Sequence, residues 1–322
     1  MTKIIAELCQ NHNGDLKILD EMVSAAADSG AEYAKIQSLL SKELTHRKKF
    51  DEGEFDSEGK EITRKRPYAD EYDRLKKLDL DDNAHHLFID LCKKYKIRPL
   101  TTIFTRSRLK FLETLGMDKI KVSSFECASH KMIEELSKSN FKEIIVSTGC
   151  THDEEIKKTS KILADSKKKF CLMHCVSIYP TPINEAHLNR IEYLKRFSEN
   201  VGMSEHSNSS KDGLKISVSS LVYKPKYIER HFTILDPSKT KDGVVSLNPQ
   251  ELKNLVEISK YNDDELNDYI KNNIPEFEDL KGNANRNLSN LEILNRDYYR
   301  GRFASLSKKG KYIYNWEQIE LI

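Results

Sequence analysis

The sequence predicts an α/β fold, a (β/α)8 TIM barrel with a short C-terminal extension. Short apolar runs alternate strictly with amphipathic helical stretches, which is typical of a parallel sheet. The alternation repeats eight times in about 260 residues, which favours a closed barrel over an open sheet. No GxGxxG motif follows the first strand, so a dinucleotide-binding fold is disfavoured. We expect the barrel at residues 1–265, a linker at 266–282 and the extension at 283–322.

Each expected strand is a short apolar run. The eight strands are expected at residues 4–8, 31–37, 97–104, 118–124, 142–149, 169–177, 200–206 and 225–232. The intervening helices carry apolar residues at i, i+3 and i+4 spacing. In the first helix, at residues 15–29, these are Leu16, Leu19, Met22 and Val23, and Gly30 ends the helix.

The remaining helices follow the later strands in the same way. One begins near Asp82 or Asn83, either of which can cap it. The others are expected at residues 106–115, 131–137, 153–163, 185–197, 210–222 and 248–258. The long charged stretch from Ser38 to about Asp79 shows no clear element of its own.

Composition argues against several classes of protein. The net charge is +2, and short basic runs at 46–49 and 167–169 are offset by acidic stretches, so no nucleic-acid partner is expected. No apolar run approaches the roughly 20 residues that span a membrane, and the N-terminus leads into a strand rather than a signal peptide. The six cysteines form no CxxC pair, which predicts reduced, buried thiols in a cytoplasmic protein.

Polar residues close all eight expected strands. In a (β/α)8 barrel the active site lies at the C-terminal ends of the strands, so we expect these side chains to meet at one mouth. The first strand ends with Glu7 and the polar run 10–14. The other strands end with Lys35, Gln37, Thr101, Thr102, Lys121, Ser124, Glu126, Ser147, Ser177, Tyr179, Ser204, Glu205, His206 and His231.

Two kinds of chemistry are indicated at this mouth. His206 and His231 close adjacent strands, where two imidazoles can bind one divalent metal. Structural, hydrogen-bonded histidines are the alternative, and the residues alone leave both interpretations open. A small anion such as a phosphate or carboxylate suits the nearby ammonium and hydroxyl groups of Lys35, Lys121, Ser124, Ser147 and Ser204. A strand-end lysine can instead be a surface group, but apolar neighbours favour burial of both lysines.

Seven motifs occur in order along the chain: IAELCQNHNGD, AEYAKIQ, KIKVSSFEC, IIVSTG, LMHCVSIYPTP, VGMSEHS and IERHFT. Together they resemble the N-acetylneuraminate (sialic acid) synthase family, including its pseudaminic and legionaminic acid branches. The resemblance covers about residues 3 to 260. It implies condensation of phosphoenolpyruvate with the open-chain aldehyde of an N-acetylated amino-hexose of the N-acetylmannosamine type. The implied products are a nine-carbon nonulosonic acid and phosphate.

The resemblance also implies roles for individual residues. A divalent metal, manganese or magnesium, is held by His206 and His231 and polarises the aldehyde oxygen. The implied catalytic carboxylates are Glu7, at the reacting centre, and Glu126 and Asp242, which approach the sugar. The implied substrate-binding residues are Lys35, Gln37, Thr102, Lys121, Ser124, Ser147, Ser177, Tyr179 and Ser204. Family members form homodimers, so a homodimer is expected here.

The chain departs from the family pattern in several places. Glu205 stands where the family usually has Asp, Ile103 stands where it has Pro, and Thr240-Lys241-Asp242 replaces Gly-Pro-Asp. The largest departure is the tail, which resembles the first half of an antifreeze-like domain and ends before that domain's arginine-bearing segment. The tail has its own arginines that can take this role: Arg296, Arg300 and Arg302.

The aromatic residues of the tail need cover, because burying one large aromatic is worth about 1.5–3 kcal/mol. We expect them to pack on a barrel, with a dimer partner's barrel preferred over their own; they are Phe303, Tyr312, Tyr314 and Trp316. Two other functions stay open. One is a related phosphoenolpyruvate-dependent synthase that takes a different aldehyde, and the other is a barrel that binds a phosphorylated sugar without turnover. The sequence does not name the sugar.

Overall fold

Eight parallel strands close into a barrel in the computed structural model, which describes residues 1–321. Their order around the barrel is β1-β10-β9-β8-β7-β6-β5-β2, so the last strand pairs with the first. The strands are β1 (Lys3–Cys9), β2 (Tyr33–Ser38), β5 (Arg98–Ile103), β6 (Lys119–Val122), β7 (Glu143–Ser147), β8 (Lys169–Cys175), β9 (Asn200–Glu205) and β10 (Tyr227–His231). All eight predicted strands and the (β/α)8 barrel are confirmed.

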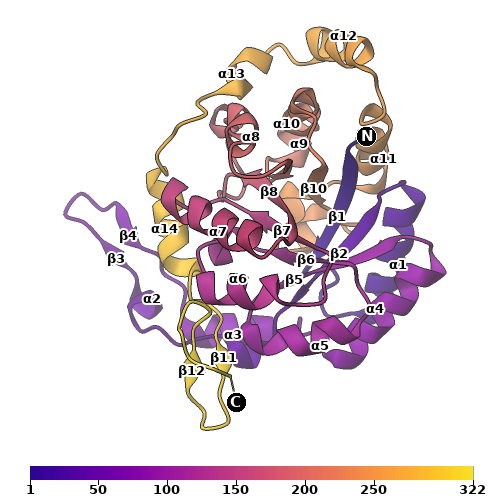
Figure 1. Ribbon diagram of the computed structural model, residues 1–322. Helices are drawn as coiled ribbons and strands as arrows, with labels where there is room; N and C mark the ends of the chain where they lie inside the picture. Colours follow the sequence, from indigo (N-terminus) through magenta and orange to yellow (C-terminus); the bar gives the residue numbers. More distant parts are fainter. Residues whose placement is uncertain (322) are drawn as a thin grey trace.

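Helices cover the outside of the barrel (Figure 1). They are α1 (Leu16–Asp28), α4 (Asp82–Lys94), α5 (Leu109–Thr114), α6 (His130–Ser137), α7 (Asp153–Asp165), α8 (Asn189–Leu194), α9 (Ser209–Asp212), α10 (Lys215–Ser220) and α11 (Pro249–Ile258). Asp15 caps α1, whereas α4 is capped by Asp81 and not by the expected Asp82 or Asn83. The single helix expected at 210–222 is divided into α9 and α10, because Gly213 between them has a φ of 56°.

The barrel interior is apolar at one end and polar at the other. An inner cluster fills the N-terminal half of the barrel; it consists of Ile5, Tyr33, Leu100, Ile145, Cys171, Met173 and Tyr227. Side chains two residues apart on a strand share a face, so Glu7 on β1 lies above Ile5. The apolar cluster therefore forms a floor beneath the polar groups at the C-terminal ends of the strands.

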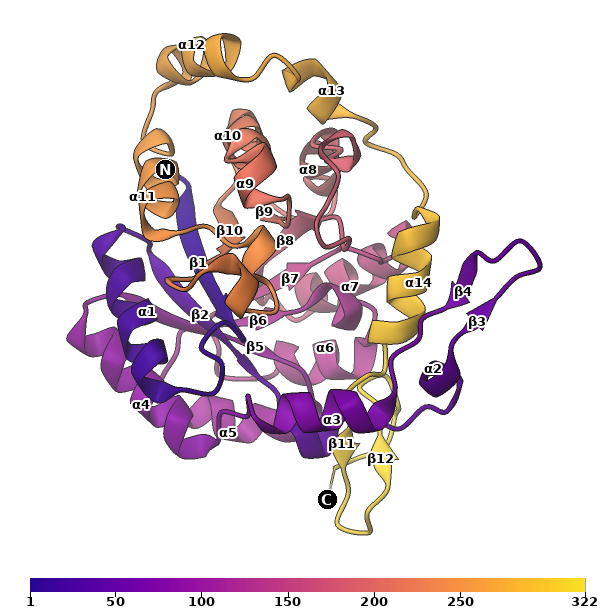
Figure 2. The same ribbon diagram turned by 180° about the vertical axis from the view of Figure 1, so that it is seen from behind.

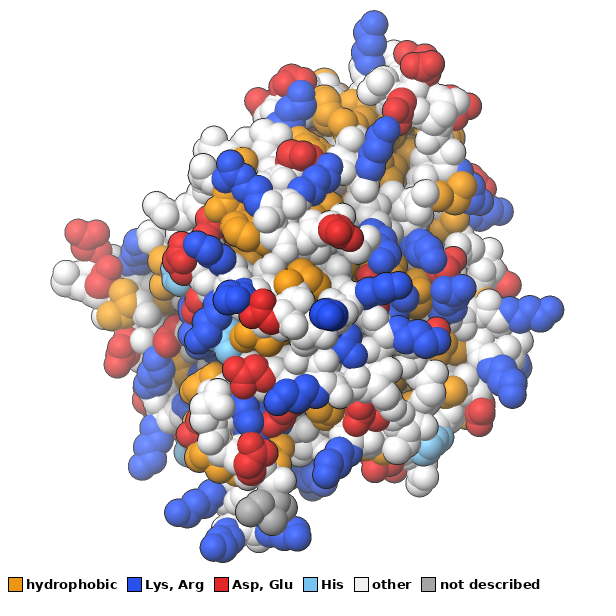
Figure 3. Space-filling view, viewed as in Figure 1, with side chains coloured by type: hydrophobic (Ala, Val, Ile, Leu, Met, Phe, Trp, Pro, Cys, Tyr) orange, Lys and Arg blue, Asp and Glu red, His pale blue; other side chains and the backbone are white. Residues whose placement is uncertain are grey.

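Charged side chains of both signs are interspersed over the surface in Figure 3, as the net charge of +2 leads one to expect. No helix within residues 1–321 combines the length and the apolar character needed to cross a membrane. All six cysteines are buried and unpaired in this part of the chain, in agreement with the expectation of free thiols.

The segment from 38 to 79 contains regular structure, contrary to expectation. It forms α2 (Lys49–Glu52), a hairpin of β3 (Glu54–Phe55) and β4 (Glu61–Thr63), and α3 (Tyr68–Lys76). These strands have only two and three residues, and Leu75 is the single buried residue of α3, so hydrophobic periodicity is too weak to reveal the elements. The hairpin projects away from the barrel (Figure 1).

The tail folds back over its own barrel. The expected linker holds most of α12 (Asp263–Asn273) and all of α13 (Phe277–Lys281), and then come α14 (Asn290–Tyr299) and a hairpin of β11 (Ser305–Leu306) and β12 (Tyr312–Ile313). Both Figure 1 and Figure 2 place this hairpin beside α3. Phe303 is buried with Leu39, Leu44 and Leu75, and its ring meets the edge of Phe104 at 5.5 Å. The preference for a partner's barrel is therefore wrong for Phe303.

Asn315 connects the end of the tail to the segment after β5 by hydrogen bonds. Its side chain is fully buried, donates to the Phe104 carbonyl at 2.7 Å and accepts from the Arg106 amide at 3.3 Å. On either side of it, Tyr314 and Trp316 are half-buried and stack on each other at 4.8 Å. The tail is thus held by polar as well as apolar contacts within one chain.

Candidate active site

A cavity of about 310 Å³ opens at the C-terminal ends of the strands. Of the fourteen predicted site residues, all but Glu126 and Ser177 line it: Glu7, Lys35, Gln37, Thr102, Lys121, Ser124, Ser147, Tyr179, Ser204, His206, His231 and Asp242. The strand register brings several of these together, because Glu7 pairs with Lys35 and Thr102 pairs with Lys121. The barrel geometry thus assembles the predicted site.

Two lysines and two glutamates form a buried charge network at the base of the cavity. Lys35 forms an ion pair with Glu7, and its Nζ lies 3.6 Å from Glu229 Oε2 and 2.8 Å from Thr102 Oγ1. On the other side, Lys121 Nζ lies 3.1 Å from Glu229 Oε1. Each of these four charged side chains is at most 4% exposed, so their charges act in a medium of low dielectric.

The network shifts the pKa values of its members. Burial lowers the pKa of Lys35, whereas the carboxylates of Glu229 and Glu7 raise it. The net shift of this pKa is upward. For Lys121 burial prevails, and its pKa is lowered despite the attraction of Glu229. Burial raises the pKa of Glu229, but Lys121 and Lys35 together bring it down to about 2. Glu229 is therefore ionised at neutral pH, and it faces both lysines.

Glu229 was missed in the sequence, although a signal was present. It lies two residues before His231 on β10, so strand alternation places both on the inner face. Ser204 of β9 stands opposite Glu229 in the register, and its hydroxyl donates to Glu229 Oε1 at 3.1 Å. Ser147 Oγ, by contrast, is buried without a hydrogen-bond partner among the described residues. A buried polar group of this kind needs a partner, which indicates a ligand-binding site.

His206 directly follows β9, and His231 ends the neighbouring strand β10. The rings of His206 and His231 are 5.1 Å apart, and Tyr179 packs against His206 at 4.3 Å. Burial, reinforced by His231, lowers the pKa of His206 well below its ordinary value, so its ring is neutral. Among the described residues, His231 Nδ1 is buried without a hydrogen bond, and it lies 3.8 Å from Asp242 Oδ2. An imidazole nitrogen without a partner fits a divalent metal.

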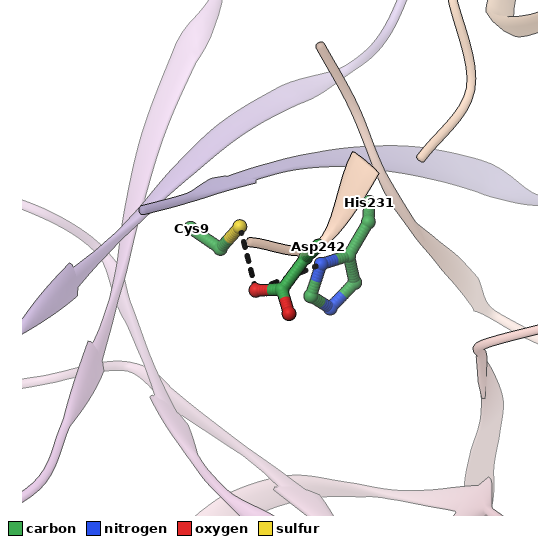
Figure 4. A group of neighbouring side chains, drawn as sticks. All are labelled: Cys9, His231 and Asp242. Atoms are coloured by element: carbon green, nitrogen blue, oxygen red, sulfur yellow. Dashed lines mark hydrogen bonds and ion pairs between the residues drawn. The ribbon is translucent and has the colours of Figure 1, made fainter. Parts of the chain in front are cut away.

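The thiol of Cys9 lies beside Asp242 at the mouth. The Cys9 Sγ–H donates to Asp242 Oδ2 at 3.3 Å. Figure 4 shows Cys9 of β1, His231 of β10 and Asp242 of the loop after β10 converging. One ligand atom from each of the three lies within 4.8 Å of the others. The sequence predicts only that the cysteines are reduced and buried, and it is the fold that brings Cys9 beside Asp242, 233 residues away in the chain.

Glu126 and Ser177 lie behind the cavity wall, which corrects their expected contact with substrate. Glu126 ends the 3₁₀ turn Ser124–Glu126, which presents Ser124 and Phe125 to the cavity and turns Glu126 away. Its carboxylate accepts from Ser129 Oγ at 2.6 Å, and burial raises its pKa to about 7. The hydroxyl of Ser177 lies 3.6 Å from the Cys175 thiol.

The rim of the cavity comes from the two segments that flank it, residues 38–79 and the tail. It contributes Arg66, Glu71, Arg74, Tyr298, Tyr299 and Arg302, and of these only Arg302 was expected from the sequence. Glu71 pairs with Arg74 at 2.9 Å and also with Arg302. Burial, Arg47 and Arg66 lower the pKa of Arg302 to about 9.

Only one of the tail arginines proposed from the sequence faces the cavity. Arg302 lines it, whereas Arg296 and Arg300 approach Glu155 outside it, at 2.6 and 3.5 Å. A hydrogen-bond chain also joins the rim to the base. Arg74 donates to Gln10 at 2.7 Å, Gln10 to Gln37 at 3.5 Å, and Gln37 to Glu7 at 3.1 Å.

The fold and this mouth define a class: a (β/α)8 barrel whose strand ends carry buried cations, hydroxyls and carboxylates for a polar, anionic ligand. A family model described as the NeuB family matches residues 22–271. The N,N'-diacetyllegionaminic acid synthase of Campylobacter jejuni is 33% identical over 266 residues, covering 79% of this chain and 74% of that relative. The chain belongs to the NeuB family.

Two further comparisons agree with this assignment. A pseudaminic acid synthase of Campylobacter jejuni is 26% identical, and the alignment covers 99% of this chain and 86% of that relative. The crystal structure of an N-acetylneuraminic acid synthetase from Leptospira borgpetersenii superposes with a TM-score of 0.70. The two sequences are 24% identical, and the superposition covers 92% of this chain and 90% of that chain. This comparison supports the fold alone.

Proposed function

We propose that this protein condenses phosphoenolpyruvate with an N-acetylated amino-hexose aldehyde to form a nonulosonic acid and phosphate. The observation that carries the proposal is the buried Lys35–Glu7–Glu229–Lys121 network beneath a histidine pair at the barrel mouth. The synthase names of the C. jejuni relatives support it. The chemistry is transfer of a three-carbon unit with formation of one C–C bond.

The anion-binding groups suit phosphoenolpyruvate. Lys35 and Lys121 supply charge, and Thr102, Ser124, Ser147 and Ser204 supply hydroxyls around them. Two carboxylates already neutralise the two ammonium groups, so a trianionic substrate needs further positive charge. The rim arginines supply part of it, and a divalent cation at the histidines supplies the rest.

His206 and His231 are the residues that would hold such a cation, Mn²⁺ or Mg²⁺. Bound there, it would act as a Lewis acid toward the sugar aldehyde. Side chains of the protein position the catalytic carboxylate and bind the sugar. Gln37 donates to Glu7 and, together with Lys35, fixes the carboxylate in place. Tyr179 and Asp242 line the cavity beside the histidines, Gln37 lines it beside Glu7, and all three are assigned to the sugar.

The reaction balances as follows. The C2=C3 double bond of phosphoenolpyruvate opens as C3 forms a bond to the aldehyde carbon, and the aldehyde oxygen gains a proton. Water adds to the electron-poor C2 and loses a proton, which Glu7 is positioned to accept. The C2–O bond to phosphate then breaks and the C2 hydroxyl proton passes to the leaving phosphate, which gives the 2-keto acid and inorganic phosphate.

A phosphate-release assay with phosphoenolpyruvate and a panel of N-acetylated hexoses tests the proposal. We expect release only when an accepted sugar and a divalent metal are both present, with a nonulosonic acid as the second product. Binding of phosphoenolpyruvate without phosphate release for any sugar would overturn the proposal and favour a binding protein.

We also propose a homodimer in the cytoplasm. The projecting β3–β4 hairpin supports the dimer, because it exposes Phe55 and Ile62, which are 60% and 50% accessible and suit burial against a second copy. Six buried free thiols fit a reducing compartment. Sedimentation of the purified protein at several concentrations tests the dimer, and a Phe55→Asp/Ile62→Asp variant should sediment as a monomer.

A further inference from the structure

Cys9 occupies an unusual position at the end of β1. Its φ is 40°, in the left-handed region that residues with a Cβ rarely adopt, and the β1–β2 register shifts between Glu7 and Cys9. Such a bulge re-aims side chains at strand ends and is common beside active sites. Strained backbone of this kind persists where the surroundings hold it, and it gives grounds for a functional hypothesis. Here the thiol points to Asp242.

The spacing of the neighbouring atoms fits a metal ion. Cys9 Sγ is 3.3 Å and His231 Nδ1 is 3.8 Å from the same oxygen, Asp242 Oδ2. A tetrahedral divalent ion with bonds of about 2.0–2.3 Å holds adjacent ligand atoms roughly 3.3–3.8 Å apart. Two of the distances between ligand atoms therefore already match those of such a site. Within residues 1–321 this is the one group of three potential ligands whose atoms approach this closely.

The three side chains are held in place. His231 ends β10, the strand next to β1, and its Nδ1 has no hydrogen-bond partner although the residue is only 6% exposed. Asn11 Nδ2 donates to Ser246 Oγ at 2.9 Å, and Ser246 Oγ donates to the Asp242 carbonyl at 2.7 Å. The loop that carries Asp242 is thereby tied to the segment that carries Cys9.

We propose that Cys9 Sγ, His231 Nδ1 and the Asp242 carboxylate bind one divalent cation, so that the mouth contains a sulfur-ligated metal site. Binding breaks the S–H bond, releases that proton to solvent and replaces the S–H···O hydrogen bond with metal bonds. Thiolate is a soft ligand, so the site should prefer Zn²⁺, Co²⁺ or Fe²⁺ to Mg²⁺. The inference rests on the proposed function and revises its metal site: His231 is kept, Cys9 and Asp242 are added as ligands, and the expected choice of manganese or magnesium is replaced.

A second thiol supplies a matched control. Cys175 also lines the mouth, and its Sγ lies 3.8 Å from His206 Nδ1. It differs from Cys9 in facing His206 and the Ser177 hydroxyl, not Asp242. A spectroscopic signal from a metal–sulfur bond can therefore be assigned to one thiol or the other by substitution.

The test is a Co²⁺ titration of the full-length protein, stripped of metal by a chelator and kept reduced and free of oxygen. We expect a thiolate-to-cobalt charge-transfer band in the near ultraviolet with one equivalent bound. Cys9→Ser should lose the band and bind Zn²⁺ at least tenfold more weakly, while Cys175→Ser keeps both. Asp242→Asn should keep the band but need more Co²⁺ to saturate, which gives a second variant if Cys9→Ser misfolds.

A band that persists in Cys9→Ser, or that disappears in Cys175→Ser, would overturn the inference. Native protein without any such band would overturn it as well. Phosphate release measured on the same samples separates this outcome from the proposed function. Turnover without the cobalt–thiolate band would leave the synthase activity standing and remove Cys9 as a ligand. A cobalt–thiolate band without turnover on any sugar would keep Cys9 as a ligand and overturn the proposed synthase activity.

Discussion

Lys35 and Glu7 face each other across the β1–β2 register and form an ion pair that is buried almost completely. Lys35 also reaches Glu229, so one ammonium group is shared by two carboxylates. A pair so deeply buried is poor evidence for stability in itself, because desolvation offsets much of the attraction. Removing only one partner, however, leaves an uncompensated charge.

We therefore expect Lys35→Met to destabilise the protein by about 3–5 kcal/mol, because Glu7 is left buried without its partner. The double variant Lys35→Met/Glu7→Gln should lose less than the sum of the two single changes. Urea unfolding of the four proteins measures the coupling. Additive effects would show that the pair is solvated and not buried.

Lys121→Ala should weaken phosphoenolpyruvate binding about ten- to a hundredfold, since one charge-assisted bond is worth roughly 1.5–3 kcal/mol. Calorimetric titration measures this directly. Lys119→Ala is the control, because Lys119 lies at the other end of β6 and pairs with Glu143. Equal affinities for the Lys121 variant and the native protein would remove Lys121 from the anion site.

Glu126→Gln tests the position of Glu126 behind the cavity wall. A carboxyl whose folded-state pKa is raised from 4.5 to about 7 stabilises the fold below pH 4.5, and this contribution is lost as the pH rises from about 4.5 to about 7. The variant should therefore lack this pH dependence and should be more stable than the native protein at pH 8, by roughly 1–3 kcal/mol.

Thermal unfolding between pH 4 and pH 8 follows the effect. The KM for the sugar should change little, since Glu126 does not line the cavity. A large rise in KM without any change in the pH profile would instead place the carboxylate on the substrate.

Arg302→Ala should raise the KM for the sugar about tenfold or more and change phosphoenolpyruvate affinity less. The reason is that Arg302 lines the rim while the lysines lie at the base. Arg296→Ala is the matched control, because Arg296 pairs with Glu155 outside the cavity. Steady-state kinetics with both substrates varied separates the two effects. Equal changes for both arginines would indicate a general loss of tail structure.

Phe303→Ala should destabilise the protein by about 3–5 kcal/mol, as for other buried aromatics. Because Phe303 packs within its own chain, the loss should not depend on protein concentration. Differential scanning calorimetry over a hundredfold range of concentration measures this. A loss that appears only at concentrations where the dimer forms would place Phe303 at the partner's barrel.

The barrel was predictable because its signals are local and repeated. Each strand is a continuous apolar run, and the barrel rule places every strand end at one mouth, so Lys35, Lys121 and His231 could be grouped without coordinates. Glu229 was predictable by the same alternation that selects His231. The partner of each residue across the barrel was not, because register is set by tertiary packing.

Most of the rim could not be predicted, for a different reason. Arg66 and Arg302 lie in loops, and Arg74 lies in α3, which has a single buried residue. The contacts of Arg74 and Arg302 with Glu71 shape the rim, and no apolar repeat marks them. The orientation of Glu126 depends on a single 3₁₀ turn, and motif resemblance does not specify such a turn. Likewise, the approach of Cys9 to Asp242 requires a bulge that leaves no mark in composition.

The pairing of Glu71 with Arg302 joins residues 231 positions apart. During synthesis the ribosome releases the strands and their lysines well before the last residues of the tail emerge. A nascent chain that has formed these strands still lacks the part of the entrance that Arg302 supplies. Closing so long a loop costs entropy, which the contact between Glu71 and Arg302 has to offset, so we expect this part of the entrance to form after the strands that carry the lysines.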